Sequence, residues 1–97
     1  MFTRCRVFRA ATDMVCSLDL DGPHCPKLLV DVYHVANNKY IVLVWDVTSL
    51  FENLDYVMYV EADSVSEIVR TVVRELEKLY RCSFDYVKEH YVHGKYC

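Results

Sequence analysis

The residues whose types and spacing best suit chemistry are histidines and cysteines towards the end of the sequence. A metal site could draw on Cys82, His90, His93 and Cys97, with His24-Cys25 as a second source. His90, His93 and Cys97 are three and four residues apart, so a helix would place them on one face, where they could chelate Zn²⁺. A strand would instead place His90 and His93 on opposite faces. No Cys-x-x-Cys pair accompanies them. We therefore predict surface histidines here and no metal site.

A short acidic motif lies earlier in the chain. Asp19-Leu20-Asp21-Gly22 resembles the Asp-x-Asp-Gly nucleophile loop of haloacid-dehalogenase-like phosphatases. The resemblance implies a nucleophilic first aspartate, an acid/base second aspartate and a nearby Mg²⁺ at the end of a buried strand. It covers four residues, and Pro23 follows where that family usually has threonine or serine. The preceding Cys16-Ser17-Leu18 is a weak strand sequence. The motif is therefore interpreted as a solvated turn.

Two further carboxylates, Asp31 and Asp46, lie inside apolar runs, where an unpaired charge is costly. A pair of strand acids can hold Mg²⁺ in a nuclease, and this gives a third-ranked functional hypothesis. The alternatives are an outward-facing Asp31 and an Asp46 that is solvated at a strand end. No residue is predicted to be catalytic, and no cofactor is expected.

The chain contains five cysteines, at positions 5, 16, 25, 82 and 97. We predict one intrachain disulfide whose partners the sequence does not define, with buried free thiols as the alternative. The chain also has sixteen valines, eight tyrosines and no glutamine. Few thermolabile amides and many intracellular cysteines favour a hyperthermophilic source. A viral or mobile-element protein in the cytoplasm of such a host is the expectation.

A basic stripe follows the polar side of a predicted helix and consists of Arg70, Arg74, Lys78 and Arg81, with Arg4 and Arg6 adding charge near the start of the chain. Such a stripe can follow the phosphates of a nucleic acid. Acidic residues at positions 67, 75 and 77 supply partners three and four residues away, which favours a salt-bridged, solvated face instead. Nucleic-acid binding is therefore the second functional hypothesis.

The clearest predicted element is a helix over residues 65–81. Apolar residues recur at spacings of three and four, and Ser64 followed by Glu67 has the spacing of a capping box. Strands are expected over 28–35 and 40–47, joined as a hairpin by Asn37-Asn38, and over 56–62. The weaker assignments are strands over 2–10 and 84–92, a loop over 14–26 and a helical turn over 48–54. If residues 84–96 were helical instead, they could form a lid over the sheet.

Composition limits the class of protein. The 97 residues are 54% hydrophobic and 26% charged, which excludes a disordered chain and suits one domain over residues 1–97. No apolar run is long enough for a membrane span, and the N-terminus has no apolar core of a secretory signal. The net charge of −3 gives no general attraction for nucleic acid. The predicted fold is α+β: an antiparallel sheet of four to five strands with one long helix on one face.

The run from Tyr40 to Trp45 is apolar on both alternating faces, and one helix covers only one of them. A second copy of the chain is the simplest cover for the other face, because two-fold homodimers are the commonest assembly. The predicted interface consists of Trp45, Tyr33, Tyr59 and Leu43. The leading hypothesis is therefore a non-enzymatic interaction or regulatory protein that acts as a homodimer, with an unidentified protein as a further partner.

Overall fold

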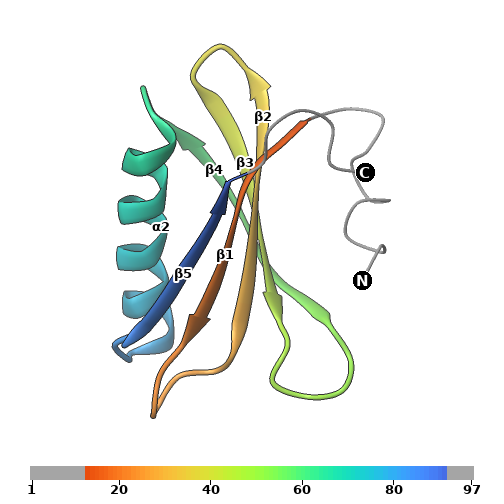
Figure 1. Ribbon diagram of the computed structural model, residues 1–97, viewed down its shortest axis with the longest axis vertical. Helices are drawn as coiled ribbons and strands as arrows, with labels where there is room; N and C mark the ends of the chain where they lie inside the picture. Colours follow the sequence, from red (N-terminus) through yellow and green to blue (C-terminus); the bar gives the residue numbers. More distant parts are fainter. Residues whose placement is uncertain (1–12, 92–97) are drawn as a thin grey trace.

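A computed structural model of the chain describes residues 13–91. It contains five strands and one helix: β1 (Asp13–Asp21), β2 (Leu28–Ala36), β3 (Lys39–Asp46), β4 (Asn53–Glu61), α2 (Val65–Tyr80) and β5 (Tyr86–Tyr91). The strands form one sheet in the order β4-β3-β2-β1-β5, and every neighbouring pair is antiparallel. The helix lies across one face of the sheet (Figure 1). The predicted α+β fold is confirmed, and the predicted strand over 2–10 lies outside the described residues.

The β2–β3 hairpin forms where the sequence predicts it. Asn37 adopts a positive φ of 48°, which asparagine tolerates better than most residues, and so the chain turns at Asn37-Asn38. Beyond the turn, β2 and β3 pair from Ala36 and Lys39 to Leu28 and Asp46. This hairpin places β3 between β2 and β4, where both of its faces are largely buried.

The prediction of a loop over 14–26 is wrong for its first half. Residues 13–21 form β1, which pairs with β2 on one side and β5 on the other. Alternation explains the strand: Cys16, Leu18 and Leu20 are buried, whereas the intervening residues are polar and only partly buried. The Asp-Gly-Pro sequence ends this strand at Asp21 rather than preventing it. Asp19 is therefore a strand residue, not part of a turn.

Two other weak assignments are settled by the structure. Residues 48–52 form no helical turn, because the Ser49 hydroxyl bonds to the Phe51 backbone and supports an irregular loop, and β4 begins at Asn53. Residues 86–91 form a strand at the edge of the sheet, as favoured, and not a helical lid.

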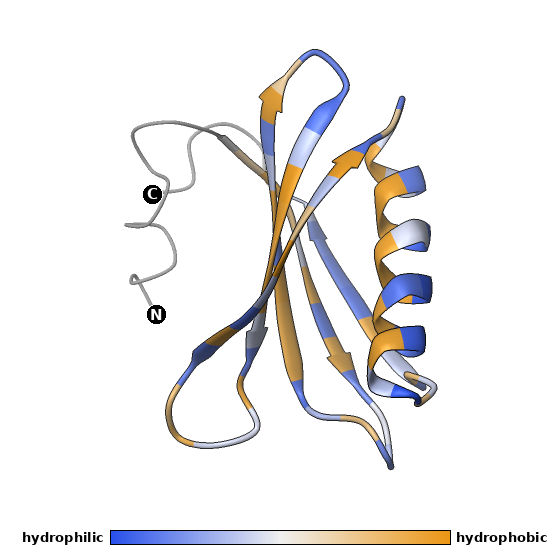
Figure 2. Ribbon diagram, turned by 180° about the vertical axis from the view of Figure 1, so that it is seen from behind, coloured by the Kyte–Doolittle hydropathy of each residue, from blue (hydrophilic) through white to orange (hydrophobic). Residues whose placement is uncertain are grey.

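The helix α2 is capped at both ends. The Ser64 side chain accepts a hydrogen bond from the Glu67 N–H at 3.3 Å, which confirms the predicted start of the helix. At the other end Arg81 adopts a left-handed conformation, with φ 53°, and ends the helix. Ile68, Val72 and Leu76 are buried. The hydrophobic parts of the helix ribbon lie towards the sheet and the hydrophilic parts lie outward (Figure 2).

The sheet has a core on each face. The larger core lies between the sheet and α2 and includes Leu18, Val30 and Leu76. The smaller one lies on the opposite face and contains Met14, Tyr33, Leu43 and Trp45, all at most 6% exposed. Both faces of the central strands are therefore removed from solvent within one copy of the chain.

Candidate interaction surfaces

The face of the sheet opposite α2 was the predicted dimer interface. Three of the four predicted residues, Tyr33, Leu43 and Trp45, are buried in the single chain, and Tyr59 is 81% exposed. A second copy could not reach the buried three without rearrangement. Of the predicted set, only Tyr59, which lies on β4, is available to a partner.

The outer edge of β4 is the most exposed apolar region of the described chain. Among residues 13–91, no strand pairs with this edge. Tyr56 and Val57 are about two-fifths exposed, and the preceding β3–β4 loop carries Leu50 at 97% and Phe51 at 77%. Unpaired edges with apolar side chains are places where another chain can add a strand.

A bulge marks the beginning of this edge. The pairing of β3 with β4 shifts between Val44 and Trp45, so that Asp55 is the extra residue on β4. The Asp55 carboxylate accepts a hydrogen bond from the Tyr80 hydroxyl of α2. Burial and this hydrogen bond raise the pKa of Tyr80, which keeps the hydroxyl protonated as a donor. The charge of Asp55 is thus turned towards the helix.

An apolar hollow lies at the far end of β4. Its volume is about 250 Å³, and its lining includes Val35, Ile41 and Tyr59 with the flanking Lys39 and Glu61. The exposed loop residues Leu50 and Phe51 precede the other end of the same strand. β4 therefore has protruding apolar side chains at one end and an apolar recess at the other.

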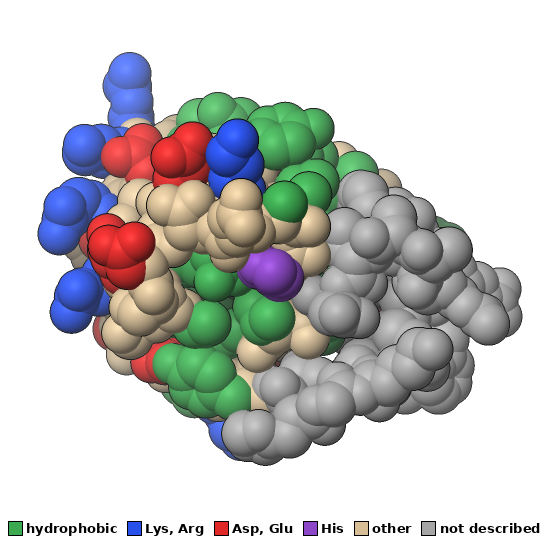
Figure 3. Space-filling view, turned by 90° about the horizontal axis from the view of Figure 1, so that it is seen from above, with side chains coloured by type: hydrophobic (Ala, Val, Ile, Leu, Met, Phe, Trp, Pro, Cys, Tyr) green, Lys and Arg blue, Asp and Glu red, His purple; other side chains and the backbone are tan. Residues whose placement is uncertain are grey.

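The basic stripe lies on the solvent side of α2, as predicted, with all four of its described residues exposed: Arg70, Arg74, Lys78 and Arg81. Figure 3 shows Lys and Arg side chains gathered on the helix side of the molecule, with acidic side chains beside them. One ion pair is formed, between Lys78 Nζ and Glu75 Oε1 at 3.7 Å. The three arginines form no ion pair with the described residues.

The structure explains why the expected salt bridges of the stripe are few. Glu67 accepts a hydrogen bond from the Asp63 N–H at 3.4 Å, at the start of the helix. Glu77 accepts one from the Phe84 N–H at 3.0 Å, beyond its end. Both carboxylates therefore serve the backbone and are not paired with the arginines. Arg4 and Arg6 lie outside the described residues.

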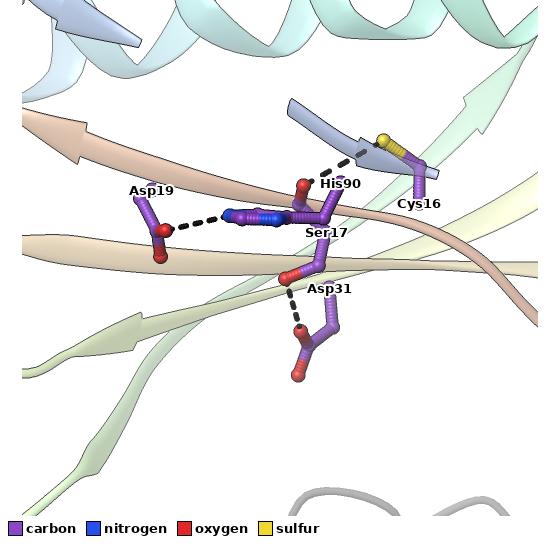
Figure 4. Close-up of polar contacts among 5 residues, drawn as sticks. All are labelled: Cys16, Ser17, Asp19, Asp31 and His90. Carbon is purple, nitrogen blue, oxygen red and sulfur yellow. Dashed lines mark hydrogen bonds and ion pairs between the residues drawn. The ribbon is translucent and has the colours of Figure 1, made fainter. Parts of the chain in front are cut away.

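Four polar side chains meet on the face of β1, β2 and β5 that is opposite α2 (Figure 4). His90 Nε2 lies 2.8 Å from Asp19 Oδ2, and the Ser17 hydroxyl donates to Asp31 Oδ1 at 3.2 Å. Ser17 and His90 are register partners on neighbouring strands, but the serine hydroxyl is directed to Asp31 and the imidazole to Asp19. The cluster consists of two separate pairs and lacks the serine-to-histidine bond that activates a nucleophile.

Asp31 and Asp46, the two strand acids of the third hypothesis, do not come together. Asp31 lies opposite Leu43 and Asp46 lies opposite Leu28, which places the two carboxylates on opposite faces of the sheet. Asp31 is buried, whereas Asp46 accepts a hydrogen bond from the Thr48 N–H at 2.9 Å. They cannot share one metal ion. Within residues 13–91 no group of three His, Cys, Asp or Glu side chains is arranged to hold a metal, and His93 and Cys97 lie outside that range.

The three cysteines within residues 13–91 divide into a bridge and a buried thiol. Cys25 and Cys82 form a disulfide with Cα atoms 5.6 Å apart, an intrachain bridge of the kind expected. It joins the β1–β2 turn to the second residue after the helix. Cys16 is free and fully buried. Desolvation, with the negative charges of Glu89 and Asp31, raises the pKa of the Cys16 thiol to about 11, so it stays neutral and unreactive at neutral pH.

Two of these features were not found from the sequence. The Ser17–Asp31 and Asp19–His90 pairs depend on β1, whose alternation of apolar and polar residues was the available signal. The exposed β3–β4 loop was interpreted as a helical turn because Ser49 and Glu52 have capping-box spacing. A Leu-Phe pair between polar residues was the signal for an exposed apolar loop.

Within the described residues, no helix is long and apolar enough to cross a membrane. Comparison of the chain with protein-family models, with curated proteins and with solved structures found no match to any of them.

Proposed function

We propose that this protein is a non-enzymatic interaction protein that acts as a homodimer. The observation that supports the proposal best is the free edge of β4, where Tyr56, Val57 and Tyr59 are exposed next to the exposed loop residues Leu50 and Phe51. Contiguous exposed apolar surface of this kind marks protein interfaces. Tyrosine is also enriched in such interfaces. The proposal moves the interface from the sheet face to the sheet edge.

The polar groups support a binding role over catalysis. The serine, histidine and two aspartates of Figure 4 form two separate contacts, Ser17 with Asp31 and His90 with Asp19, and no serine-to-histidine bond is among them. The single described free thiol, Cys16, is buried and neutral. A cytoplasmic location and a viral or mobile-element origin in a hyperthermophilic host stay predictions from composition.

Light scattering coupled to size exclusion, at micromolar concentration, tests the proposal. One chain has a mass of 11.4 kDa, and we expect about twice this value. The variant Tyr59→Lys places a charge on the free edge and should shift the mass to that of one chain. Lys88→Ala, on the opposite edge strand, is the control and should leave the dimer intact. A single-chain mass for the unaltered protein at all concentrations would contradict the proposal.

Nucleic-acid binding through α2 is the second candidate. The observation that favours it is that Arg70, Arg74 and Arg81 are exposed and unpaired with any residue of 13–91, while Glu67 and Glu77 are held by the backbone. The four basic residues of the stripe extend over about 16 Å of helix, at 1.5 Å per residue. Phosphate contacts by such a stripe would weaken steeply as salt rises.

A gel-shift assay over a range of salt concentrations tests this candidate. Arg70→Ala combined with Arg74→Ala should weaken any binding and reduce its salt dependence by about two phosphate contacts. Lys88→Ala, which removes one positive charge away from the helix, serves as the matched control. Equal binding by both variants would exclude the stripe.

A further inference from the structure

The hydrogen bonds at the two ends of β3 define which backbone groups of β4 are free. The Ala62 N–H donates to the Asn38 C=O at 2.9 Å, and the Val47 N–H donates to the Lys27 C=O at 2.9 Å. In an antiparallel ladder, pairs that exchange hydrogen bonds alternate with pairs that do not. The first bond shows that Asn38 directs its backbone groups to β4, and the second shows that Val47 directs its backbone groups to β2. Because the direction alternates along the strand, the even-numbered residues of β3 direct their backbone groups to β4.

The same alternation applies across the β3–β4 pair. Tyr40 lies opposite Val60 and Val42 lies opposite Met58, so these even-numbered β4 residues direct their N–H and C=O groups to β3. Val57 and Tyr59 must then direct their backbone groups outward, away from the sheet. Their side chains lie on the face opposite α2 and are 41% and 81% exposed. The free edge thus offers hydrogen-bonding groups and apolar side chains at the same two residues.

We infer that two copies of this chain pair through β4, antiparallel, about a two-fold axis at Met58. This inference rests on the proposed homodimer and names its interface. In this register Val57 of each copy lies opposite Tyr59 of the other, and each such pair exchanges both backbone hydrogen bonds. An aromatic residue opposite a β-branched residue is a favourable cross-strand pair. On the helix side, Tyr56 of one copy lies opposite Val60 of the other, and Met58 lies opposite Met58 of the other copy.

Neighbouring registers are less favourable. An axis at Val57 would place Tyr59 opposite Asp55, the bulged residue whose carboxylate is bound to Tyr80. An axis at Tyr59 would place Val57 opposite Glu61 and leave a carboxylate beside an apolar side chain. The Met58 register alone pairs apolar residues at every position from 56 to 60. It ends where the bulge at Asp55 turns the chain towards α2.

The hollow and the loop supply the remaining contact. Pairing two strands alone buries less than the roughly 800 Å² per partner that a stable interface needs. In the Met58 register, Leu54 of one copy lies opposite Ala62 of the other, so the β3–β4 loop of one copy starts just past the end of the partner's β4, next to the end at which the 250 Å³ apolar hollow lies. Leu50 and Phe51, exposed in one chain, would be covered there. The two-fold axis forms this contact twice.

Disulfide cross-linking tests the register. Met58→Cys and Val57→Cys are made singly in a background with Cys5→Ser and Cys97→Ser, and each protein is oxidised mildly and analysed by non-reducing electrophoresis. Opposite residues of a non-hydrogen-bonded pair have Cα atoms about 4.5 Å apart, within the range of a disulfide. We expect Met58→Cys to form a covalent dimer. Val57→Cys should not, because its own copy lies diagonally across the axis, about 7–8 Å away.

Further measurements separate the outcomes. A mixture of Val57→Cys with Tyr59→Cys should yield the mixed covalent dimer, because these two residues lie opposite each other in the Met58 register. Phe51→Ala should raise the dimer dissociation constant about tenfold. Cross-linking of Val57→Cys in place of Met58→Cys would overturn the register. A dimeric mass with no cross-link at β4 would overturn this inference and leave the proposed homodimer standing, whereas a single-chain mass would remove both.

Discussion

The two edge strands of the sheet differ in how they are protected. β5 is six residues long and carries three consecutive polar residues, Lys88, Glu89 and His90. β4 is nine residues long and has no charge between residues 56 and 60. Short, charged edges resist the addition of another strand, and long apolar ones favour it. The β5 edge, the closed edge, is thus protected from strand addition by its length and composition. The β4 edge, the open edge, is not.

The anchoring of the two edges differs as well. The Asp85 N–H, just before β5, donates to the Asp21 C=O at 3.1 Å, and the Cys25–Cys82 disulfide lies close by in sequence. β4 is joined to α2 by the Asp55–Tyr80 hydrogen bond near its beginning. A disulfide therefore lies close to the β5 edge, whereas the β4 edge is held by its pairing with β3 and by the hydrogen bond to α2, with no disulfide there among residues 13–91. Substitutions in the core that both edges share, and substitutions near one edge only, test this difference.

The largest effect is expected from Leu76→Ala. Leu76 is fully buried between α2 and the sheet, and truncation of a core leucine costs about 2–5 kcal/mol of unfolding free energy. Because α2 supports the whole sheet, both edges should lose stability together in denaturant unfolding. Leu79→Ala, at a residue that is 48% exposed, is the matched control and should cost less than about 1 kcal/mol. Equal losses for the two variants would mean that the helix face is misassigned.

Removal of the Cys25–Cys82 bridge should affect the β5 edge selectively. The bridge joins residues 57 apart in sequence, and such a crosslink typically contributes about 2–4 kcal/mol. In the double variant Cys25→Ser, Cys82→Ser, we expect hydrogen exchange to accelerate in β5 and at the end of α2, with little change in β4. A count of free thiols in the denatured, unreduced protein is the control for the bridge itself. Uniform acceleration over the whole sheet would contradict the separation of the two edges.

Gly22→Ala should destabilise the same region to a smaller extent. A Cβ atom at Gly22 would lie 2.7 Å from the Ser83 carbonyl oxygen and 3.2 Å from Cys25 Sγ. The backbone beside the disulfide would have to shift, at a cost of about 1–3 kcal/mol. Ser83→Ala keeps that carbonyl and should stay within about 0.5 kcal/mol of the unaltered protein. Thermal unfolding of the two variants measures the difference.

The smallest effect is expected from His90→Ala. The His90–Asp19 pair joins β5 to β1, but both side chains are more than two-fifths exposed. Exposed pairs of this kind contribute about 0–1 kcal/mol and are screened by salt. Asp19→Asn should give a similar small loss, and the difference from the unaltered protein should shrink at high salt. A loss above about 2 kcal/mol would identify this pair, and not the bridge, as the main anchor of the closed edge.

The regular elements were the predictable part of this fold. The hairpin over β2 and β3 and the helix α2 have strong local signals: two apolar runs around Asn37-Asn38, and a capped sequence with helical periodicity. β1 was missed because its polar positions, Ser17, Asp19 and Asp21, weaken a search for continuous apolar runs. These residues are polar because they lie on the same face of the sheet as His90 of β5. His90 comes some 70 residues later in the sequence, so no local pattern reveals this contact.

The burial of Tyr33, Leu43 and Trp45 was not predicted, for a related reason. The two-sided apolar character of β3 was recognised, but the sequence does not state which residues cover its second face. Met14 of β1 contributes to that second core, and β1 had been interpreted as a loop. β4 has a free edge because β5 pairs with β1 and not with β4. That long-range pairing has no local sequence signal, and so the exposed Tyr59 could be proposed but not its neighbours in the loop.

The position of β5 in the sheet also has a consequence for the order of folding. β1 to β4 are joined by short connections, and the pairings among these four strands are all between sequence neighbours, so this part can form from local contacts alone. β5 pairs with β1 across most of the chain, Tyr91 opposite Cys16, and such distant pairing is slow because a large loop must close first. During synthesis the outer edge of β1 therefore stays unpaired after β1 to β4 have formed. Until residues 86–91 have been synthesised, the nascent protein has two unpaired strand edges, on β1 and β4, instead of one. This is the stage at which a chaperone would protect it most from aggregation.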